Sequence, residues 1–413
     1  MATAINAIAN ERQLARNYWG TEVRLGVAVA PTYRMYGDLR INRSRPLADR
    51  NEFAGTYFKD YTPVRGGVVI DGTYAQTLTY EDLPILLRYS VQGGVTGVSD
   101  AETTPGYTYT QKPTASRKDI DYATVEGGFP GMPWKATGLH LPEFTISADI
   151  DDTEAAWKWS GSAMALTKDL DAVTSGTATS GTTLTVVNSG ASYTINEFAG
   201  AFVEMTGGAT TANIGEKREI ISNTGTALTV AGVFPSAVAN TDTYVISGAF
   251  TAGISDRTRE TIDAPDTSVF IDTGTIGTTE IPGRIISWSV NYNINSAGKR
   301  FMDNPTGYSR FGFGATVVTG QIRVEADERD EYDAWTAGTA ERIRFQQVGS
   351  TIDSGAATKK MARIDVHNVQ YDTLTDDDRD NNVTYTIGFR GFVDSVAGVP
   401  ITFLTKNKLS ALP

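Results

Sequence analysis

The chain has 413 residues, no cysteine, two histidines and a formal net charge of −12, with 20% charged and 40% hydrophobic residues. This composition is typical of a folded protein with more than one domain. It excludes disulfides and thiolate metal sites, and it leaves too few histidines for a histidine metal cluster or a catalytic triad. The acidic balance argues against general nucleic-acid binding, which needs a basic surface. No stretch approaches the ~20 apolar residues of a membrane span, and the N-terminus lacks a secretory signal pattern.

The first 36 residues are expected to form an N-terminal arm, with a helical stretch at 7–18 and a strand at 23–29. The next segment, from residue 37, predicts a strand, a loop, a second strand and a short helix. The helix, at 81–89, is indicated by two acids before the apolar positions and by Pro84 in the first turn. Strands at 138–149 and 155–165, joined by an Asp-rich turn, close this segment.

A long insert at 99–135 is rich in Thr, Tyr and Gly. Two runs in it, 107–112 and 120–125, alternate between apolar and polar residues. They predict a long β-hairpin with a polar tip, which is too extended to fold without a partner surface.

The same order of elements recurs near the C-terminus. Strands are predicted at 285–292 and 316–325, a short acidic helix at 327–335, and further strands at 342–349, 361–371 and 383–392. An Asp-rich turn at 376–380 separates the last two. We therefore predict a tandem duplication covering about 37–166 and 283–395. The alternative is two unrelated β-sandwiches that merely look alike.

Residues 171–248 differ in composition, because they are poor in aromatics and rich in Ser, Thr, Gly and Ala. Short strand patterns with Gly and Asn turns predict a small separate β domain, immunoglobulin-like or barrel-shaped. The predicted fold is mainly β, with two tandem β-sandwich or split-barrel domains, each with a short helix. The predicted divisions are 1–36 (arm), 37–170 (first domain), 171–248 (inserted domain), 249–282 (extended connecting arm) and 283–413 (second domain and C-terminal tail).

Three parts of this sequence carry a resemblance to a known family: the run 283–291, the run 319–325 with the acidic helix after it, and the terminal strand 383–393 together with the strand pair 138–148 and 157–165. In element order they resemble the major tail tube proteins of long-tailed (siphovirus-like) bacteriophages. No single motif is diagnostic. The resemblance implies a virion structural protein made in the host cytoplasm, which self-assembles into stacked rings around a channel for DNA ejection.

The resemblance also implies partners. Two copies in one chain imply homotrimeric rings with pseudo-sixfold symmetry, the alternative being homohexameric rings. Further expected partners are the tape measure protein, the tail terminator and the baseplate or tail-tip proteins. DNA would pass without specific binding, and no enzyme activity, cofactor, metal or membrane is expected. The inserted domain would decorate the outside of the tube.

Candidate residues follow from these expectations. A channel for DNA should be neutral or acidic, because a basic wall would hold the phosphates. Which face of the sheets looks inward stays open at this point. The lumen-lining candidates are Asp71, Glu143, Asp149, Glu325, Asp327 and Asp365. The ring-stacking candidates lie in the hairpin and in the region 268–281, and are Tyr107, Tyr109, Arg117, Lys118, Tyr122 and Phe270.

Other readings of the same residues remain. Carboxylate pairs such as Asp149 with Asp151 suggest a glycosidase dyad, but 48 acids produce such pairs by chance. The run 376–380 suggests calcium ligands, but a solvated turn explains it better. Four tryptophans are assigned to packing rather than to sugar stacking, and both histidines to the surface or an interface. The alternative functions are a receptor- or carbohydrate-binding tail or baseplate protein, and a capsid decoration protein.

Overall fold

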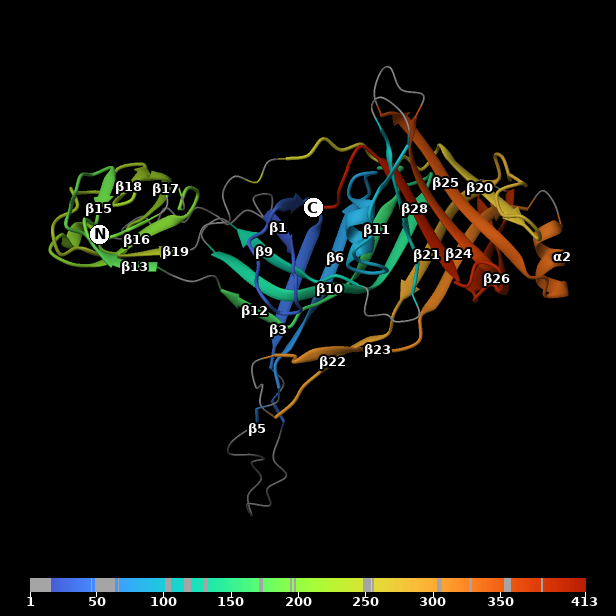
Figure 1. Ribbon diagram of the computed structural model, residues 1–413, viewed down its shortest axis with the longest axis horizontal. Helices are drawn as coiled ribbons and strands as arrows, with labels where there is room; N and C mark the ends of the chain where they lie inside the picture. Colours follow the sequence, from blue (N-terminus) through green and yellow to red (C-terminus); the bar gives the residue numbers. More distant parts are fainter. Residues whose placement is uncertain are drawn as a thin grey trace, which may run out of the picture. The chain divides into compact units, whose positions relative to one another are not determined.

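The computed structural model in Figure 1 is mainly β, with long antiparallel strands and two short α-helices, α1 (Leu83–Arg88) and α2 (Asp330–Ala337), in its described part. This confirms the predicted fold class at the level of mainly β. The structure describes residues 16–45, 47–48, 64–65, 67–100, 105–114, 120–129, 132–170, 174–193, 195–196, 198–247, 254, 256–302, 307–326, 329–352, 358–379 and 382–413.

The chain divides into two compact units. The first unit comprises Met1–Tyr36, Thr124–Thr137 and Thr167–Arg257, and the second comprises Gly37–Ala123, Gly138–Leu166 and Thr258–Pro413. Each is described by itself.

The first unit contains a seven-stranded sheet within the predicted range 171–248. Its order is β13-β19-β16-β17-β18-β15-β14, and a separate hydrophobic cluster packs on it. The strands are β13 (Thr174–Thr177), β14 (Ser180–Gly181), β15 (Thr185–Val187), β16 (Phe202–Gly207), β17 (Lys217–Asn223), β18 (Ala227–Ala231) and β19 (Thr243–Ser247). The other strands of this unit are β1 (Arg16–Thr21), β2 (Tyr33–Met35), most of β9 (Ala123–Phe129), the first part of β10 (Met132–Asp149) and β12 (Thr167–Leu170).

The second unit is built on eight strands that pair in the order β3-β6-β11-β10-β21-β24-β27-β26. We name these the long sheet. Besides β10, its strands are β3 (Asp38–Ser44), β6 (Val69–Thr77), β11 (Lys158–Met164), β21 (Ile285–Asn293), β24 (Val317–Glu325), β27 (Asn382–Gly391) and β26 (Lys359–Arg379).

A second set of strands shares β26 with the long sheet. The first half of β26 pairs with β25 on one edge and β28 on the other, which gives the order β20-β25-β26-β28-β8-β7. Besides β26, these strands are β20 (Thr267–Asp272), β25 (Glu341–Thr351), β28 (Ile401–Asn407), β8 (Tyr107–Gln111) and β7 (Val98–Ser99). Two short pairs, β22 (Ser296–Lys299) with β23 (Arg310–Phe313) and β4 (Leu47–Ala48) with β5 (Val64–Arg65), complete the unit.

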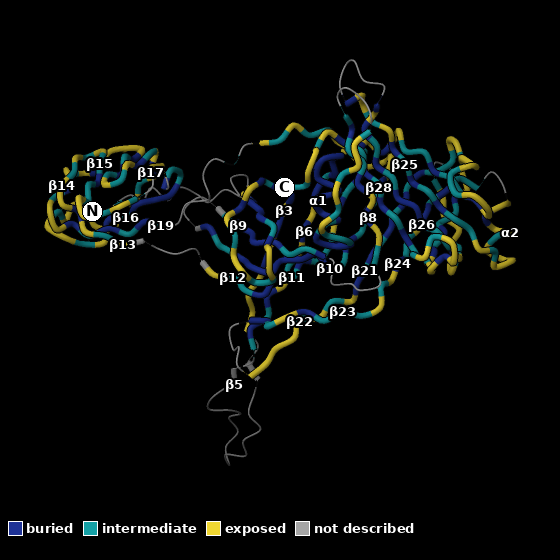
Figure 2. The backbone as a smooth tube through the Cα atoms, viewed as in Figure 1, coloured by how far each residue is buried: buried dark blue, intermediate teal, exposed yellow. Residues whose placement is uncertain are grey.

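Aromatic rings fill the core between these two sheets. Phe144 stacks on Trp159 with ring centroids 3.9 Å apart, and Trp288 stacks on Phe345 at 4.3 Å. Phe403 of β28 lies 5.8 Å from Phe144. Such pairs add to the area that the rings bury. In Figure 2 the buried positions accordingly concentrate along β6, β10, β11 and β21.

The two helices differ in their surroundings. All of α1 up to Leu87 is buried, and Pro84 occupies its first turn as the sequence indicated. In α2 only Glu331 is buried, and the helix begins with three acidic residues that suit a helix N-terminus. It ends at Gly338, whose φ of 64° is the left-handed conformation that glycine adopts at helix ends.

The predicted hairpin at 107–125 is wrong. Strand β8 pairs with β28 and β7, whereas β9 pairs with β10. Alternation in sequence identifies a strand but not its partner, and here the partner of β8 comes from the C-terminal end of the chain, nearly 300 residues away.

Two further segments differ from their predicted structure. Residues 16–18, expected in a helix, belong to β1, and the expected strand at 23–29 is a turn and loop with Val23 almost fully exposed. The rest of the predicted helix at 7–18 lies outside the described residues. The expected extended arm at 249–282 contains β20, which pairs with β25 from Thr267 to Asp272.

The acidic run 376–379 is also not a turn. These residues are the end of β26 and pair with β27 up to Arg379. Aspartate is depleted in strands, but all three aspartates here are exposed and so keep their hydration. The run therefore forms an outer strand of the long sheet.

Candidate functional site

One face of the long sheet carries mainly hydroxyl and amide side chains. Burial alternates along β21 and along β10 after its bulge, so that the odd-numbered residues of β21 and residues 143, 145, 147 and 149 of β10 point away from the aromatic core. In these two central strands the outward residues are Glu143, Thr145, Ser147, Asp149, Ser287, Ser289, Asn291 and Asn293. Neighbouring strands continue the pattern with Thr73, Ser160, Ser162, Thr319, Gln321, Thr375 and Thr386. They also carry Lys158, Arg323 and Arg390 on this face, each paired with an acid. We name this surface the polar face.

The strand order of the long sheet is the same in its two halves. The first half contains β3, β6, β10 and β11. Across the sheet they lie in the order β3-β6-β11-β10, so the third and fourth strands of the chain exchange places. The second half contains β21, β24, β26 and β27, which lie in the equivalent order β21-β24-β27-β26. In each half a helix follows the second strand along the chain. We name these the first strand set and the second strand set.

A glycine occupies the same place in the second strand of each set. A Cβ on Gly72 would overlap the carbonyl oxygen of Arg40, and a Cβ on Gly320 would overlap that of Ser289. Gly72 pairs with Ile41 and Gly320 with Val290. Residues of β3 therefore correspond to residues of β21 with a number difference of 249 (290 − 41).

A bulge occupies the same place in the third strand of each set. His140 of β10 pairs with Met164 of β11, and Glu143 pairs with Ser162. The three-residue advance along β10 therefore lies opposite a two-residue advance along β11, which defines a bulge. In β26, residues 370 and 373 pair with 390 and 388, again three steps against two. Residues of β10 therefore correspond to those of β26 with a difference of 230 (373 − 143).

Because of these glycines, Gly72→Ala is expected to destabilise the chain by about 1–3 kcal/mol, the usual cost of inserting an atom into packed structure. The reason is that the added methyl group would force β3 away from β6. Urea unfolding followed by tryptophan fluorescence measures the change. Gly274→Ala is the matched control, because a Cβ there meets nothing within 4 Å. Equal unfolding midpoints for both variants would contradict the expectation.

The two strand sets meet where β10 pairs with β21. Seven residue pairs join them, from Glu143 with Asn293 to Asp149 with Ser287. On the polar face, the Asn291 amide nitrogen donates to Thr145 Oγ1 at 3.1 Å across the joint. This internal joint holds the two sets in one continuous sheet.

The outer edges of the long sheet are β3 and the last part of β26. Among the described strands, β3 pairs only with β6, and residues 370–379 of β26 pair only with β27. On the polar face these edges carry Asp38, Arg40, Asn42 and Ser44 on β3, and Thr373, Thr375, Asp377 and Arg379 on β26. Within the chain, Arg40 pairs with Asp38 at 3.0 Å and Asp377 with Arg323 at 2.9 Å.

Four of the lumen-lining candidates lie on the polar face. Asp71 and Glu143 border one shallow depression that crosses five strands from β3 to β21. Asp149 is exposed at the end of β10, and Glu325 accepts a hydrogen bond from Asn382 at 2.8 Å. Asp327 lies outside the described residues.

Asp365 does not belong to this group. It lies in the first half of β26, buried between Arg344 at 2.7 Å and Arg363 at 3.2 Å. Removing one partner of such a buried ion pair would leave a buried charge without a counter-charge, so Asp365 contributes to the stability of the fold. The sequence pattern could not separate it from the outward acids, because β26 is shared between two sheets.

The described ring-stacking candidates all lie in or beside strands of the second unit, and Tyr109 and Tyr122 make side-chain contacts within the chain. Tyr109 is buried and donates to the Leu409 carbonyl at 2.7 Å, and burial, with the nearby Tyr107, raises its pKa to about 12. Tyr107 pairs with Asn407, Tyr122 stacks near Phe311, and Phe270 pairs with Arg344. Arg117 and Lys118 lie outside the described residues.

His140 was expected at the surface or an interface, but it is fully buried at the β10 bulge. Its Nε2 lies 2.9 Å from Ser296 Oγ, and the Phe311 ring lies 4.2 Å away. Burial lowers its pKa to about 3, so the ring is neutral at ordinary pH. Leucines flank it in the sequence, and these apolar neighbours were the available signal for burial.

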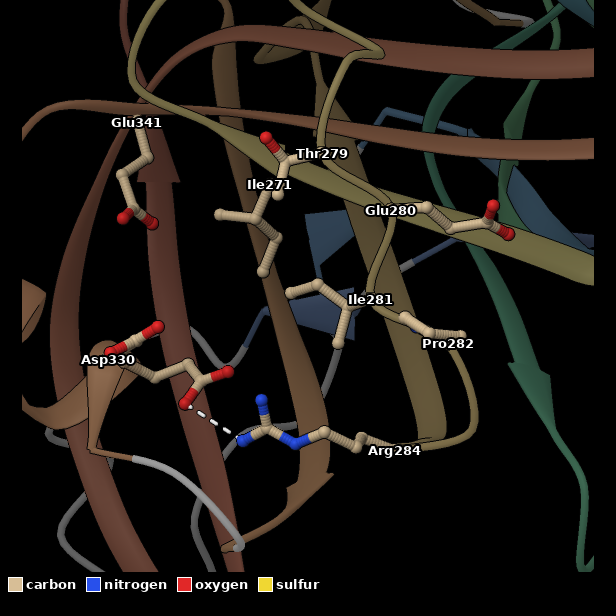
Figure 3. A pocket seen from close by; sticks show the side chains of 9 residues that line it. Ile271, Thr279, Glu280, Ile281, Pro282, Arg284, Asp330 and Glu341 are labelled. Atoms are coloured by element: carbon tan, nitrogen blue, oxygen red, sulfur yellow. Dashed lines mark hydrogen bonds and ion pairs between the residues drawn. The ribbon is translucent and has the colours of Figure 1, made fainter.

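A second hollow is lined by α2, the end of β20, the segment 279–284 that follows β20, and the start of β25 (Figure 3). Arg284 pairs with Glu331 there at 3.2 Å, and burial raises the pKa of Glu341 above its usual value. No group of three or more potential metal-binding side chains occurs in the described part of the chain. None of the helices described there is long and apolar enough to cross a membrane.

Comparison with known proteins identifies no relative: no family model matches the chain, and no curated protein matches its sequence.

Proposed function

We propose that this chain is a structural protein of a bacteriophage virion, which assembles into closed rings that stack into the hollow tail tube for DNA ejection. The observation that carries the proposal is the β10–β21 joint, which links two strand sets of identical order. The same joint is available once more between the outer edges of two chains. A ring results if each chain repeats it with the next.

The two strand sets are, in this proposal, tandem tail-tube-like domains. Their support is the shared strand order, the glycines at 72 and 320, and the bulges in β10 and β26. Two unrelated sheets have no reason to share all three features. Three chains would then supply six domains, in a homotrimeric ring with pseudo-sixfold symmetry.

The joint between chains has a defined register. Internally, Thr145 pairs with Asn291. The residue of β26 that corresponds to Thr145 is Thr375 (145 + 230), and the residue of β3 that corresponds to Asn291 is Asn42 (291 − 249). The joint between chains therefore pairs the same two residue types, Thr375 of one chain with Asn42 of the next. The neighbouring pairs on the polar face are then Asp38 with Arg379, Arg40 with Asp377, and Ser44 with Thr373.

On the polar face this register is complementary in charge. Each acid of one edge there faces a base of the other, and opposite charges stabilise cross-strand pairs whereas like charges destabilise them. The joint also provides partners for two edges that would otherwise invite uncontrolled pairing. On the other face the register sets Asp376 and Asp378 opposite the apolar Ile41 and Leu39, where the internal joint has Ile146 and Ala148, so this side of the joint gains no charge pair.

The polar face is proposed to line the channel. Most of its side chains are hydroxyls and amides, its cations Lys158, Arg323 and Arg390 are already paired with acids, and its remaining acids repel phosphate. DNA would therefore pass without being held. The heterologous contacts between successive rings would build an open filament. Its expected further partners are the tape measure, terminator and tail-tip proteins.

The proposal is tested by negative-stain electron microscopy of the purified chain at increasing concentration, with end-on views averaged. We expect rings or tubes of three chains with six inner lobes. Rings of six chains would retain the function but contradict the tandem domains. A persistent monomer, even with tail initiator proteins added, would contradict the tube and favour a receptor- or carbohydrate-binding role.

A further inference from the structure

The segment that joins β21 to β24, residues 294–316, lies across the first strand set; we name it the second arm. Its Arg300 donates two hydrogen bonds to the Val68 carbonyl, at 2.8 and 3.1 Å. Its Gly307 lies against the carbonyl oxygen of Leu166, and its Phe311 covers His140. The second arm therefore covers the end of the first strand set nearest the bulge.

The surface beneath the second arm is closed to solvent. His140 is 0% exposed, Val68 is 2% exposed and Leu166 is 6% exposed. This apolar surface would otherwise face water, so the arm completes the first strand set.

The corresponding surface of the second strand set is exposed. Met164 corresponds to Arg390, because both oppose the bulge, and so Leu166 corresponds to Phe392. Phe392 is 44% exposed, against 6% for Leu166. Its neighbours Val393 and Val396 are 64% and 89% exposed, and Val317 beside it is 38% exposed. We name these four residues the Phe392 patch. Apolar residues gathered in this way mark an interaction surface.

The chain contains a matching arm. The segment that joins β3 to β6, residues 45–68, follows the strand that corresponds to β21, and we name it the first arm. It has 24 residues (45 to 68) against 23 (294 to 316) in the second arm. Each arm contains four aromatic residues: Phe53, Tyr57, Phe58 and Tyr61 in the first, and Phe301, Tyr308, Phe311 and Phe313 in the second.

We propose that the Phe392 patch of one chain is covered by the first arm of a second copy, its lateral neighbour in the ring. This inference rests on the proposed function. When β3 of one chain pairs with β26 of the next as β21 pairs with β10, the first arm leaves β3 beside the bulge of β26. It thereby reaches the Phe392 patch as the second arm reaches Leu166.

The absence of native cysteine allows a direct test of this contact. Phe392→Cys is combined in turn with Phe53→Cys, Phe58→Cys and Tyr61→Cys, and each chain is assembled and treated with a short thiol cross-linker. We expect at least one combination to give covalent products of up to three chains. Ile221→Cys, in the seven-stranded sheet, replaces Phe392→Cys in the control and should give no cross-linked product. Ile221 is the more exposed of the two residues, at 59% against 44%.

A second measurement uses the patch alone. Phe392→Ser with Val396→Ser is expected to raise the concentration needed for ring formation about tenfold or more, since two apolar side chains lose burial. The melting temperature of the unassembled chain should not change, because both residues are exposed there.

Rings that form at the usual concentration, without any cross-link, would overturn the arm contact but leave the ring. Cross-linked ladders beyond three chains would place the arm on a stacked ring and overturn the lateral contact. If the unsubstituted chain forms no rings at any concentration, both the ring and the arm contact are overturned.

Discussion

A chain that carries Thr375→Cys and Asn42→Cys is expected to close into a covalent ring of three when it is assembled under oxidising conditions. The proposed joint places these residues directly opposite each other on the polar face. Opposite residues of antiparallel strands have Cα atoms about 4.5–5.5 Å apart, within the range that a disulfide bridges. Non-reducing electrophoresis should show conversion from one to three chain masses, with no native cysteine to confuse the pattern.

The internal joint supplies the positive control. Thr145→Cys with Asn291→Cys should form a disulfide within one chain, because these residues are paired at the corresponding position. The negative control is Thr375→Cys with Arg43→Cys, which moves one cysteine to the opposite face of β3. Rings that contain the first pair but resist cross-linking would show that the edges meet in another register. Efficient cross-linking of the control pair would contradict the joint.

Strand positions in this protein were largely predictable from the sequence, but strand partners were not. The alternating runs at 285–292 and 316–325 became β21 and β24, because alternation reports a half-buried strand directly. The β8 run was recognised as a strand but assigned to the wrong partner. Its actual partner, β28, is far along the chain, and local periodicity carries no information on such pairing.

The joint residues show a similar division. Asp376 and Asp377 were attributed to a turn because aspartate favours turns, yet they continue a strand at the sheet edge. Nothing in the sequence marks Asn42 and Thr375, since neither residue type is unusual in a β protein. Their correspondence to Asn291 and Thr145 follows only from the registers, which tertiary pairing determines.

The acidic candidates also show why a face cannot be assigned from composition. Glu143 and Asp365 both lie in alternating strands, but one points out from the long sheet and the other is buried between arginines. The difference depends on which sheet covers each strand. Sequence periodicity identifies two faces and does not say which one is covered.

Lysines on the polar face are expected to make the assembled tube retain DNA. Thr73→Lys, Ser160→Lys and Gln321→Lys change three exposed outward residues, and each new charge would contact a phosphate of DNA in the channel. Tubes of this variant, assembled with a short DNA duplex, should hold nuclease-resistant DNA. A ring of three chains offers nine such lysines, and three phosphate contacts alone would lower the retention about 40-fold between 50 and 200 mM salt, so the loss should be at least that large.

The matched control places three lysines on exposed positions of the seven-stranded unit, Ser180→Lys, Thr206→Lys and Thr226→Lys. This variant gains the same charge, but DNA bound at these three lysines should be digested by nuclease. Tubes of the unsubstituted chain should retain no DNA. The comparison therefore separates a channel wall from general electrostatic attraction, because only a wall both binds and shields. Equal protection in both variants, or none in the first although its tubes are intact, would mean that the polar face does not line the channel.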